Sequence, residues 1–137
     1  MVMFRLILAL MVFSFSVSRA AEKVSDGNVS IHSDSMETVN SDEMLEFNSN
    51  VIVYFKQYII HTDKVVINFI VIDGQKKIAS AIMPYPIKLI SKENSNDVIV
   101  ADQAEYCLES KTIKMNENVK IKKGDNLVVV EHFTLHL

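Results

Sequence analysis

Four acidic side chains recur at equivalent places in this sequence, and their chemistry would suit a carboxylate pair or a metal site. Asp34 and Asp102 are 68 positions apart, and Asp63 and Glu131 are separated by the same interval. Acid–base catalysis would need a nucleophile or a base beside these carboxylates, and the neighbouring residues supply no such constellation. Aspartate is also common where strands turn, because it bonds nearby backbone N–H groups. Their recurrence favours this structural role.

The histidines are candidate metal ligands, and there are four of them: His32, His61, His132 and His136. His132 and His136 are close in sequence, but on a strand residues four apart lie about 13 Å from each other, too far for one metal ion. The single cysteine, Cys107, excludes an internal disulfide and a cysteine-based zinc site. We therefore expect exposed histidines, no metal and no cofactor. Cys107 is interpreted as a small strand residue, with an intermolecular disulfide as the alternative.

Other catalytic and binding chemistries find little support. The sequence contains no Gly-x-Ser-x-Gly, His-Glu-x-x-His or phosphate-loop motif, so we expect no enzyme. The net charge of −3 argues against a nucleic-acid partner. Lysines nevertheless cluster near the C-terminus, and we interpret the cluster as a solvated face that discourages aggregation, or as a site for lipid phosphates. These lysines are Lys111, Lys114, Lys120, Lys122 and Lys123.

The elements that must position these residues are predicted to be strands. The chain has 137 residues, enough for one domain, and 49% of them are hydrophobic. Ile and Val together number 32, whereas there are only 3 Gly and 2 Pro, and such β-branched enrichment favours strands. Apolar and polar residues alternate in Leu45-Glu46-Phe47 and Val119-Lys120-Ile121. We find no amphipathic helix longer than about two turns.

The strands are organised in a repeat. Residues 31–69 align with residues 99–137 without a gap, and the clearest match joins Phe47–Val53 to Met115–Ile121. One strand–turn unit cannot bury its apolar face alone, so neighbouring units must stack. The repeat therefore predicts a stacked or rolled β architecture.

Each copy of the repeat places apolar residues on one face of a strand. Residues of shared parity are predicted to point inward. They are Leu45, Phe47, Val51 and Val53 in the first copy, and Ile113, Met115, Val119 and Ile121 in the second. The Asn-rich segments 48–50 and 116–118 are predicted to form a tight turn or bulge, where Asn tolerates positive φ. The inward parity switches at Asp63, which predicts a kink or bulge there.

The N-terminus has the features of a secretory signal. Residues 1–20 contain Arg5, an apolar run from Leu6 to Phe15, and small residues at Ser18 and Ala20. The apolar run is shorter than the roughly 20 residues that span a bilayer as a helix. We predict a signal peptide that is cleaved after Ala20. A membrane anchor that is retained is the alternative.

Several ordered runs then resemble the LptA/OstA-like family of periplasmic lipopolysaccharide-transport proteins. The runs are Ser33-Asp34, Phe47–Val53, Thr62–Val66, Pro86–Leu89, Ala101–Tyr106 and Met115–Ile121. The resemblance covers residues 31–137, which we take as the OstA-like domain. Two positions depart from the family pattern, because its usual Gly before Asn-Val is Ser49 in the first copy and Glu117 in the second.

The resemblance implies an all-β fold, an open twisted antiparallel β-jellyroll with an apolar interior. It implies a non-enzymatic periplasmic carrier that shields the acyl chains of lipopolysaccharide or another acylated lipid. LptC-like and LptD-like proteins would be its partners, and copies would associate through the edges of their terminal strands. The lipid-lining residues would be Leu45, Phe47, Val51, Val53, Val65, Ile67, Ile113, Met115, Val119 and Ile121. Two alternatives are an LptC-like adaptor anchored in the inner membrane and a β-module that binds only proteins.

Overall fold

Every regular element in the part of the chain that the structure describes is a β-strand. The computed structural model describes residues 22–27, 29–39 and 44–137. Its strands are β1 (Glu22–Ser25), β2 (Ser30–Ser33), β3 (Ser35–Val39), β4 (Met44–Tyr54), β5 (Tyr58–Ile72), β6 (Gln75–Met83), β7 (Ile87–Ser91), β8 (Asp97–Ala101), β9 (Gln103–Cys107), β10 (Thr112–Lys123) and β11 (Asn126–His136). The all-β prediction is confirmed. Within these described ranges, no helix is long and apolar enough to cross a membrane.

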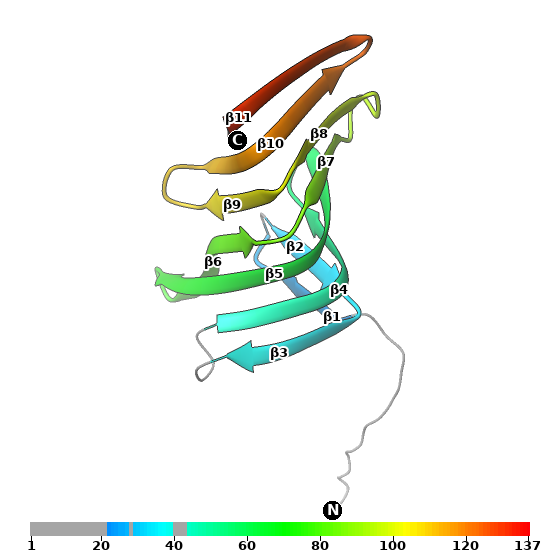
Figure 1. Ribbon diagram of the computed structural model, residues 1–137. Coiled ribbons are helices and arrows are strands. Elements are labelled where there is room, and N and C mark those ends of the chain that lie inside the picture. The colour runs from blue at the N-terminus through cyan, green and yellow to red at the C-terminus, as the bar shows by residue number, and fades with distance from the viewer. Residues whose placement is uncertain (1–21, 28, 40–43) are drawn as a thin grey trace, which may run out of the picture.

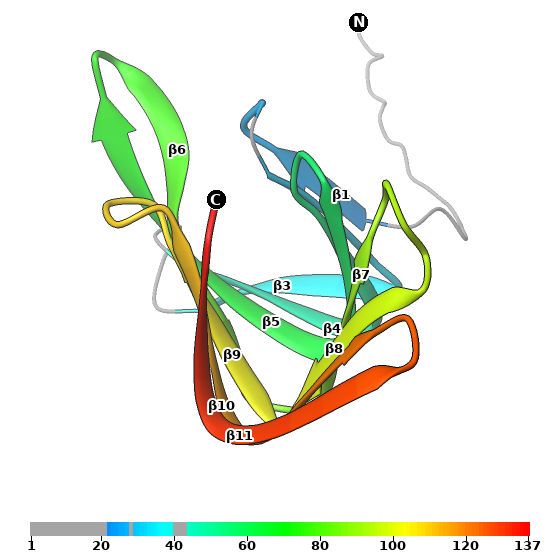
Figure 2. The ribbon, with the colours of Figure 1, turned by 90° about the horizontal axis from the view of Figure 1, so that it is seen from above.

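The strands form one antiparallel sheet that is folded into a V (Figures 1 and 2). The four long strands β4, β5, β10 and β11 run through both arms of the V, and short strands fill each arm between them. In one arm, β6 and β9 connect β5 to the first half of β10, and β3 lies beside the first half of β4. In the other arm, β7 and β8 connect β5 to the second half of β10, and β1 and β2 lie beside the second half of β4. We call these the β6 arm and the β7 arm.

A bulge bends each pair of long strands where the two arms meet. In the β4–β5 pair, Asn48 lies opposite Lys64 and Val51 opposite Thr62, so two residues, Ser49 and Asn50, face the single residue Asp63. Ser49 and Asn50 have φ angles of 68° and 52°. The β10–β11 pair repeats this geometry, with φ angles of 68° at Glu117 and 51° at Asn118. The predicted bulge is confirmed in both copies of the repeat.

The parity switch is confirmed as well. Thr62 and Val65 are both buried, although they are three positions apart on β5, because β5 switches its inward parity opposite the bulge of β4. Strand alternation alone would have sent one of the two side chains outward.

A hydrogen-bonded clamp holds each bend. The backbone N–H of Asp34 donates to the carbonyl of Ser49 over 3.0 Å, and the Asn50 amide donates to Asp34 Oδ2 over 2.7 Å. In the second copy, Asp102 and Asn118 make the equivalent side-chain bond of 2.8 Å. These contacts give Asp34 and Asp102 the structural role that their recurrence favoured. Asp63 and Glu131 are exposed and lie opposite the bulges.

The core fills the space between the arms. It is a single cluster of buried apolar side chains contributed by both arms, and many of them are fully inaccessible to water. Burying one such side chain contributes roughly 1.5–3 kcal/mol to folding. The arms are therefore held together mainly by their inner faces.

The two outer edges of the sheet differ. β11 forms one edge, and the only described strand beside it is β10. The first half of β11 is apolar and exposed, with Leu127, Val128 and Val129 at 62%, 50% and 60% exposure. β1 and β3 form the opposite edge, one in each arm. β1 begins at Glu22, before residue 31, where the resemblance to the family begins.

Candidate functional site

The candidate site is the apolar interior of the V together with its mouth. All ten residues that were predicted to line the interior do face the core. Eight of them are buried: Phe47, Val51, Val53, Val65, Ile67, Ile113, Met115 and Val119. Leu45 and Ile121 are half-buried and pack against the same cluster. The structure thus brings residues from β4, β5 and β10 together, although whether they meet lipid stays a prediction.

At depth, the interior is occupied by the protein's own side chains. Phe47 at the centre of β4 and Met115 at the equivalent place on β10 have no exposed surface. An acyl chain entering this region must therefore displace side chains or separate the arms. Methionine has three rotatable bonds and fills irregular gaps, so Met115 is suited to such rearrangement.

Two aromatic rings meet at the mouth of the V. Phe55, between β4 and β5, contacts Tyr106 at the end of β9, with ring centroids 5.0 Å apart and planes inclined by 50°. Burial raises the pKa of the Tyr106 hydroxyl above 10.0, and the charges of Asp26 and Cys107 add to this shift. Tyr106 is therefore neutral at physiological pH and presents an apolar ring to the interior.

A polar bridge crosses the mouth beside these rings. Asp26, which follows β1 in the β7 arm, accepts a hydrogen bond from the backbone N–H of Ile78 in β6 over 2.8 Å. Its second carboxylate oxygen accepts one from the N–H of Val29 over 2.9 Å, and its carbonyl accepts one from Lys77 Nζ over 3.2 Å. Asp26 thus ties the rim of one arm to the rim of the other.

An open pocket lies at the mouth near the C-terminal residues His136 and Leu137. Its volume is about 310 Å³, at the lower end of the range of roughly 300–1,000 Å³ that is typical of small-molecule sites. Apolar and aromatic side chains line most of it, and polar side chains stand at its rim. The lining residues are Val29, Phe55, Lys56, Gln57, Tyr58, Tyr106, Leu108, Lys111, His136 and Leu137. The pocket therefore combines an apolar wall with cationic groups.

Sequence reasoning missed most of these mouth residues. Phe55 could have been found, because it continues the parity of Val51 and Val53 along β4. The Asp26 bridge joins residues 52 positions apart and follows no repeat, so no local pattern indicates it.

The other candidate ligands lie apart from this interior. His32 packs edge-on against Tyr54, with ring centroids 5.3 Å apart, and His132 bonds Asn116 over 2.9 Å. Among residues 22–27, 29–39 and 44–137, no group of three or more His, Cys, Asp or Glu could hold a metal ion. Cys107 is a free, half-buried cysteine, and hydrogen bonds from the backbone and side chain of Ser110 lower its pKa.

The lysine cluster is divided by the bend of β10. Lys114 precedes the bulge at Glu117 and Asn118 and lies on the β6 arm, whereas Lys120 and Lys122 follow it and lie on the β7 arm. All five lysines of the cluster are exposed, but they do not form the one solvated face that was expected. Adjacency in sequence did not mean adjacency on one face, because the strand turns between them.

Comparison with known proteins identifies the architecture. No protein-family model and no curated protein matches the sequence. Among solved structures, the chain is similar to LptH of Pseudomonas aeruginosa, described as the LptA-homologous periplasmic component of the conserved lipopolysaccharide transport device. The TM-score is 0.60 at 13% sequence identity, and the match covers 77% of this chain and 73% of the other. The β-jellyroll prediction is confirmed.

Proposed function

We propose that this protein is a non-enzymatic periplasmic carrier that shields the acyl chains of a lipid, with lipopolysaccharide as the favoured cargo. The observation that carries the proposal is the apolar interior of the V, which both arms line and which ends in a pocket at the mouth. The fold shared with LptH supports the same conclusion. Each CH₂ taken out of water gains about 0.8 kcal/mol, so a dozen methylenes cost on the order of 10 kcal/mol to leave exposed.

The proposed path of the lipid begins at the mouth. An acyl chain would enter beside Leu108 and Tyr58, pass the contact between Phe55 and Tyr106, and reach the interior around Phe47. Lys56 and Lys111 line the same pocket, so a phosphate on the lipid head would meet positive charge while its chain is buried.

Partners are proposed at the β11 edge of the sheet. Among the described strands only β10 pairs with β11, so the outer backbone groups of β11 can pair with a strand of an LptD-like or LptC-like protein or of a second copy. Residues 1–20 are proposed to direct export and to be removed. These residues lie outside the described part of the chain.

A β-module that binds only proteins is the second candidate. The observation that favours it is the complete burial of Phe47 and Met115, since the interior is already filled at depth. In this alternative the β11 edge carries the function and the interior is an ordinary core.

Site-specific photo-crosslinking in cells tests the two candidates. A benzophenone amino acid would replace Leu108 at the mouth or Phe47 in the interior, and Glu46, on the outer face of the β6 arm, would be the control. We expect lipopolysaccharide or another acylated lipid to be captured at Leu108 and Phe47 and not at Glu46. Capture of proteins alone, or equal capture of lipid at Glu46, would overturn the carrier proposal and leave the β-module.

A further inference from the structure

One outer row of the β7 arm carries lysine or histidine on five of its eight strands. The strand register aligns eight residues across this arm, each directly opposite the next. In order they are Lys23, His32, Ile52, His61, Lys88, Val100, Lys120 and Val129. Five are Lys or His and none is acidic. We call these eight residues the basic row.

On the same outer face of the β7 arm, the next row away from the bend is mainly apolar. It runs Ser25, Ser30, Tyr54, Ile59, Ile90, Val98, Lys122 and Leu127, again without an acidic residue. The central residues of the row between these two, such as Ile60 and Leu89, are buried in the core, so the basic and apolar rows share the outer face. Lys92 adds a further cation, with Nζ 5.7 Å from the centre of the Tyr54 ring.

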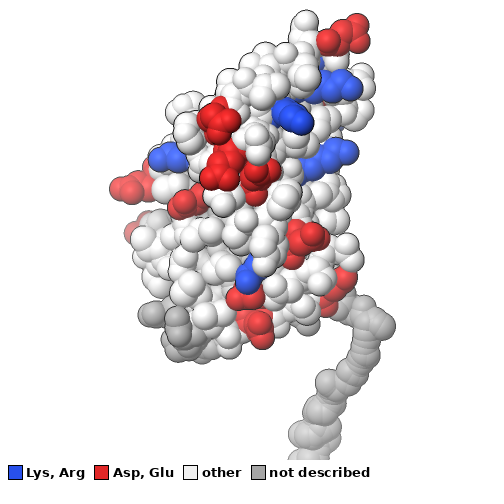
Figure 3. Space-filling model, viewed as in Figure 1, with Lys and Arg blue, Asp and Glu red and all other residues white. Residues whose placement is uncertain are grey.

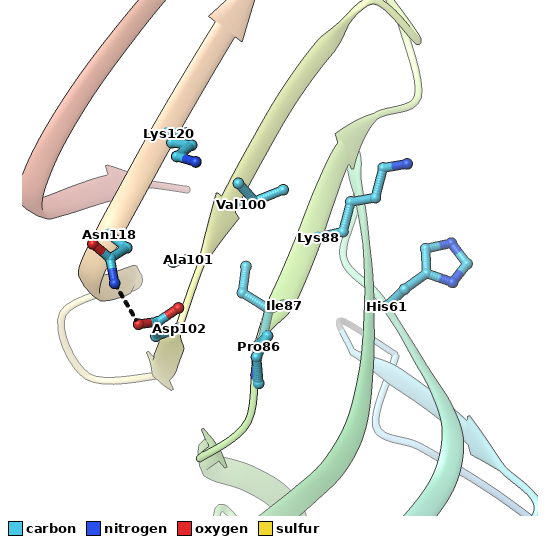
Figure 4. Close-up of a pocket in the computed structure, with 9 residues that line it drawn as sticks. All are labelled: His61, Pro86, Ile87, Lys88, Val100, Ala101, Asp102, Asn118 and Lys120. Atoms are coloured by element: carbon cyan, nitrogen blue, oxygen red, sulfur yellow. Dashed lines mark hydrogen bonds between the residues drawn. The ribbon is translucent and has the colours of Figure 1, made fainter.

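The centre of the basic row borders a hollow in the surface. Figure 4 shows His61, Lys88, Val100 and Lys120 on neighbouring strands around it, with Asp102 at its lower end bonded to Asn118. The hollow is open and has a volume of about 490 Å³. His61, Lys88 and Lys120 are exposed, whereas Val100 is half-buried. Anions that approach the hollow therefore meet the ammonium groups of Lys88 on β7 and Lys120 on β10.

The outer face of the β6 arm has the opposite charge. Its equivalent row runs Glu37, Glu46, Val66, Ile82, Glu105, Lys114 and Thr134, with three acidic residues and one lysine. In Figure 3, several lysines lie toward the side of β7, β8 and the tip of β10, and acidic side chains gather over the middle of the view, although single lysines also lie at the left and low in the centre. This row of the β6 arm is therefore net acidic, although Lys64 forms an ion pair of 3.1 Å with Glu46, whereas the basic row has no acidic residue.

We propose that the outer face of the β7 arm docks on the surface of an anionic phospholipid membrane. Lysine stems can lie along the apolar row while their ammonium groups reach phosphates, and Tyr54, Leu127 and Val129 can settle among the head groups. Charge complementarity selects an anionic occupant, and apolar residues spread among the lysines favour a lipid surface over a purely ionic partner. The inference goes beyond lipid carriage, because it concerns binding of the protein's outer face to a membrane and not binding of lipid in its interior.

Flotation with lipid vesicles tests this docking surface. The purified protein, in the form that cells export, would be mixed with vesicles of phosphatidylethanolamine and phosphatidylglycerol, or of phosphatidylcholine alone. We expect binding only to the anionic vesicles, weakened by added salt. The double variant Lys88→Glu, Lys120→Glu should lower the apparent affinity tenfold or more, because it reverses two charges at the surface.

A double variant on the other arm provides the matched control. Lys76→Glu, Lys114→Glu changes the net charge equally but leaves the basic row intact, and it should bind anionic vesicles like the parent. Thermal unfolding would check that both variants fold. Equal binding to both vesicle types, no binding to either, or equal loss in both variants would overturn the proposal. Lipid capture at Leu108 and Phe47 is a separate measurement, so failure of docking and failure of the carrier proposal are distinguishable.

Discussion

At the scale of single residues, the bends depend on backbone conformations that ordinary side chains adopt at a cost. Ser49 and Glu117 have φ angles of 68° where the resembling family has glycine, so this chain keeps the geometry without the residue best suited to it. The clamps from Asp34 to Asn50 and from Asp102 to Asn118 help to hold this strained geometry.

Restoring glycine at the bend should therefore stabilise the protein. We expect Ser49→Gly to raise the free energy of unfolding by about 1 kcal/mol, because relief of the left-handed backbone outweighs the added entropy of the unfolded chain. Urea denaturation measures the change. Ser95→Gly, at an exposed turn residue that does not have a positive φ, is the control and should not stabilise. A loss of stability in Ser49→Gly would show that the bend imposes no strain at this residue.

The buried hydroxyl of Tyr106 should make part of the stability depend on alkaline pH. Its pKa is raised in the folded state, so its contribution is present below pH 10.0 and is lost as the pH rises through the higher folded value. When the pH is raised, phenolate absorbance should include a step above pH 10.0 that comes from Tyr106, and Tyr106→Phe should remove this step. Tyr85→Phe, at an exposed tyrosine, should retain the step. Loss of the step in Tyr85→Phe would contradict its assignment to Tyr106.

Residue patterns indicated the inner faces well and the mouth poorly. Parity within the repeat identified Phe47 and Met115 as inward residues, because alternation and burial are local properties of a strand. The contact of Phe55 with Tyr106 depends on how far the two arms open, which no local pattern specifies. The bend at Asn118 also places the lysines of β10 on two different arms, although they are close together in the sequence.

At the scale of elements, Asp26 joins the end of β1 to β6 across the mouth, and we expect this bridge to limit how far the mouth opens. We expect Asp26→Ala to lower the free energy of unfolding by about 2–3 kcal/mol, since it removes a carboxylate that accepts bonds from two backbone N–H groups. The same change should increase lipid capture by a photo-crosslinker at Leu108. Asp125→Ala, in the exposed turn between β10 and β11, should change neither quantity. If Asp26→Ala destabilised the protein but did not increase lipid capture at Leu108, the Asp26 bridge would not restrict entry of lipid.

The free edge of β11 should mediate self-association. We expect Val128→Lys to reduce the association constant at least tenfold, because a charge on an exposed strand edge opposes pairing with another strand. Light scattering over a range of concentrations measures this. Val71→Lys, at an equally apolar and exposed position on another hairpin, is the control. A parent protein that stays monomeric at high concentration and binds no related β-jellyroll would contradict the edge prediction.

At the scale of the whole molecule, the proposed signal peptide defines where we expect the mature chain to begin. We expect protein recovered from the exported compartment to begin at Ala21, because Ser18 and Ala20 provide the small residues that signal peptidase requires. N-terminal sequencing measures this directly, and Ala20→Lys should block the cleavage. Recovery of the full-length parent chain only with detergent would support the anchored adaptor instead.

The two edges of the sheet differ, because one is a long strand and the other consists of short strands. β5 is a long bent strand, and its outer edge is covered by two short strands, β6 in one arm and β7 in the other. β11 is its counterpart in the second copy of the repeat, whereas the opposite edge of the molecule consists of the short strands β1 and β3. A second molecule that offered β1 to β11 would reproduce, in the β7 arm, the internal pairing of β7 with β5. Such head-to-tail joining leaves one free end of each kind, so the assembly would grow as a polar filament with no intrinsic length.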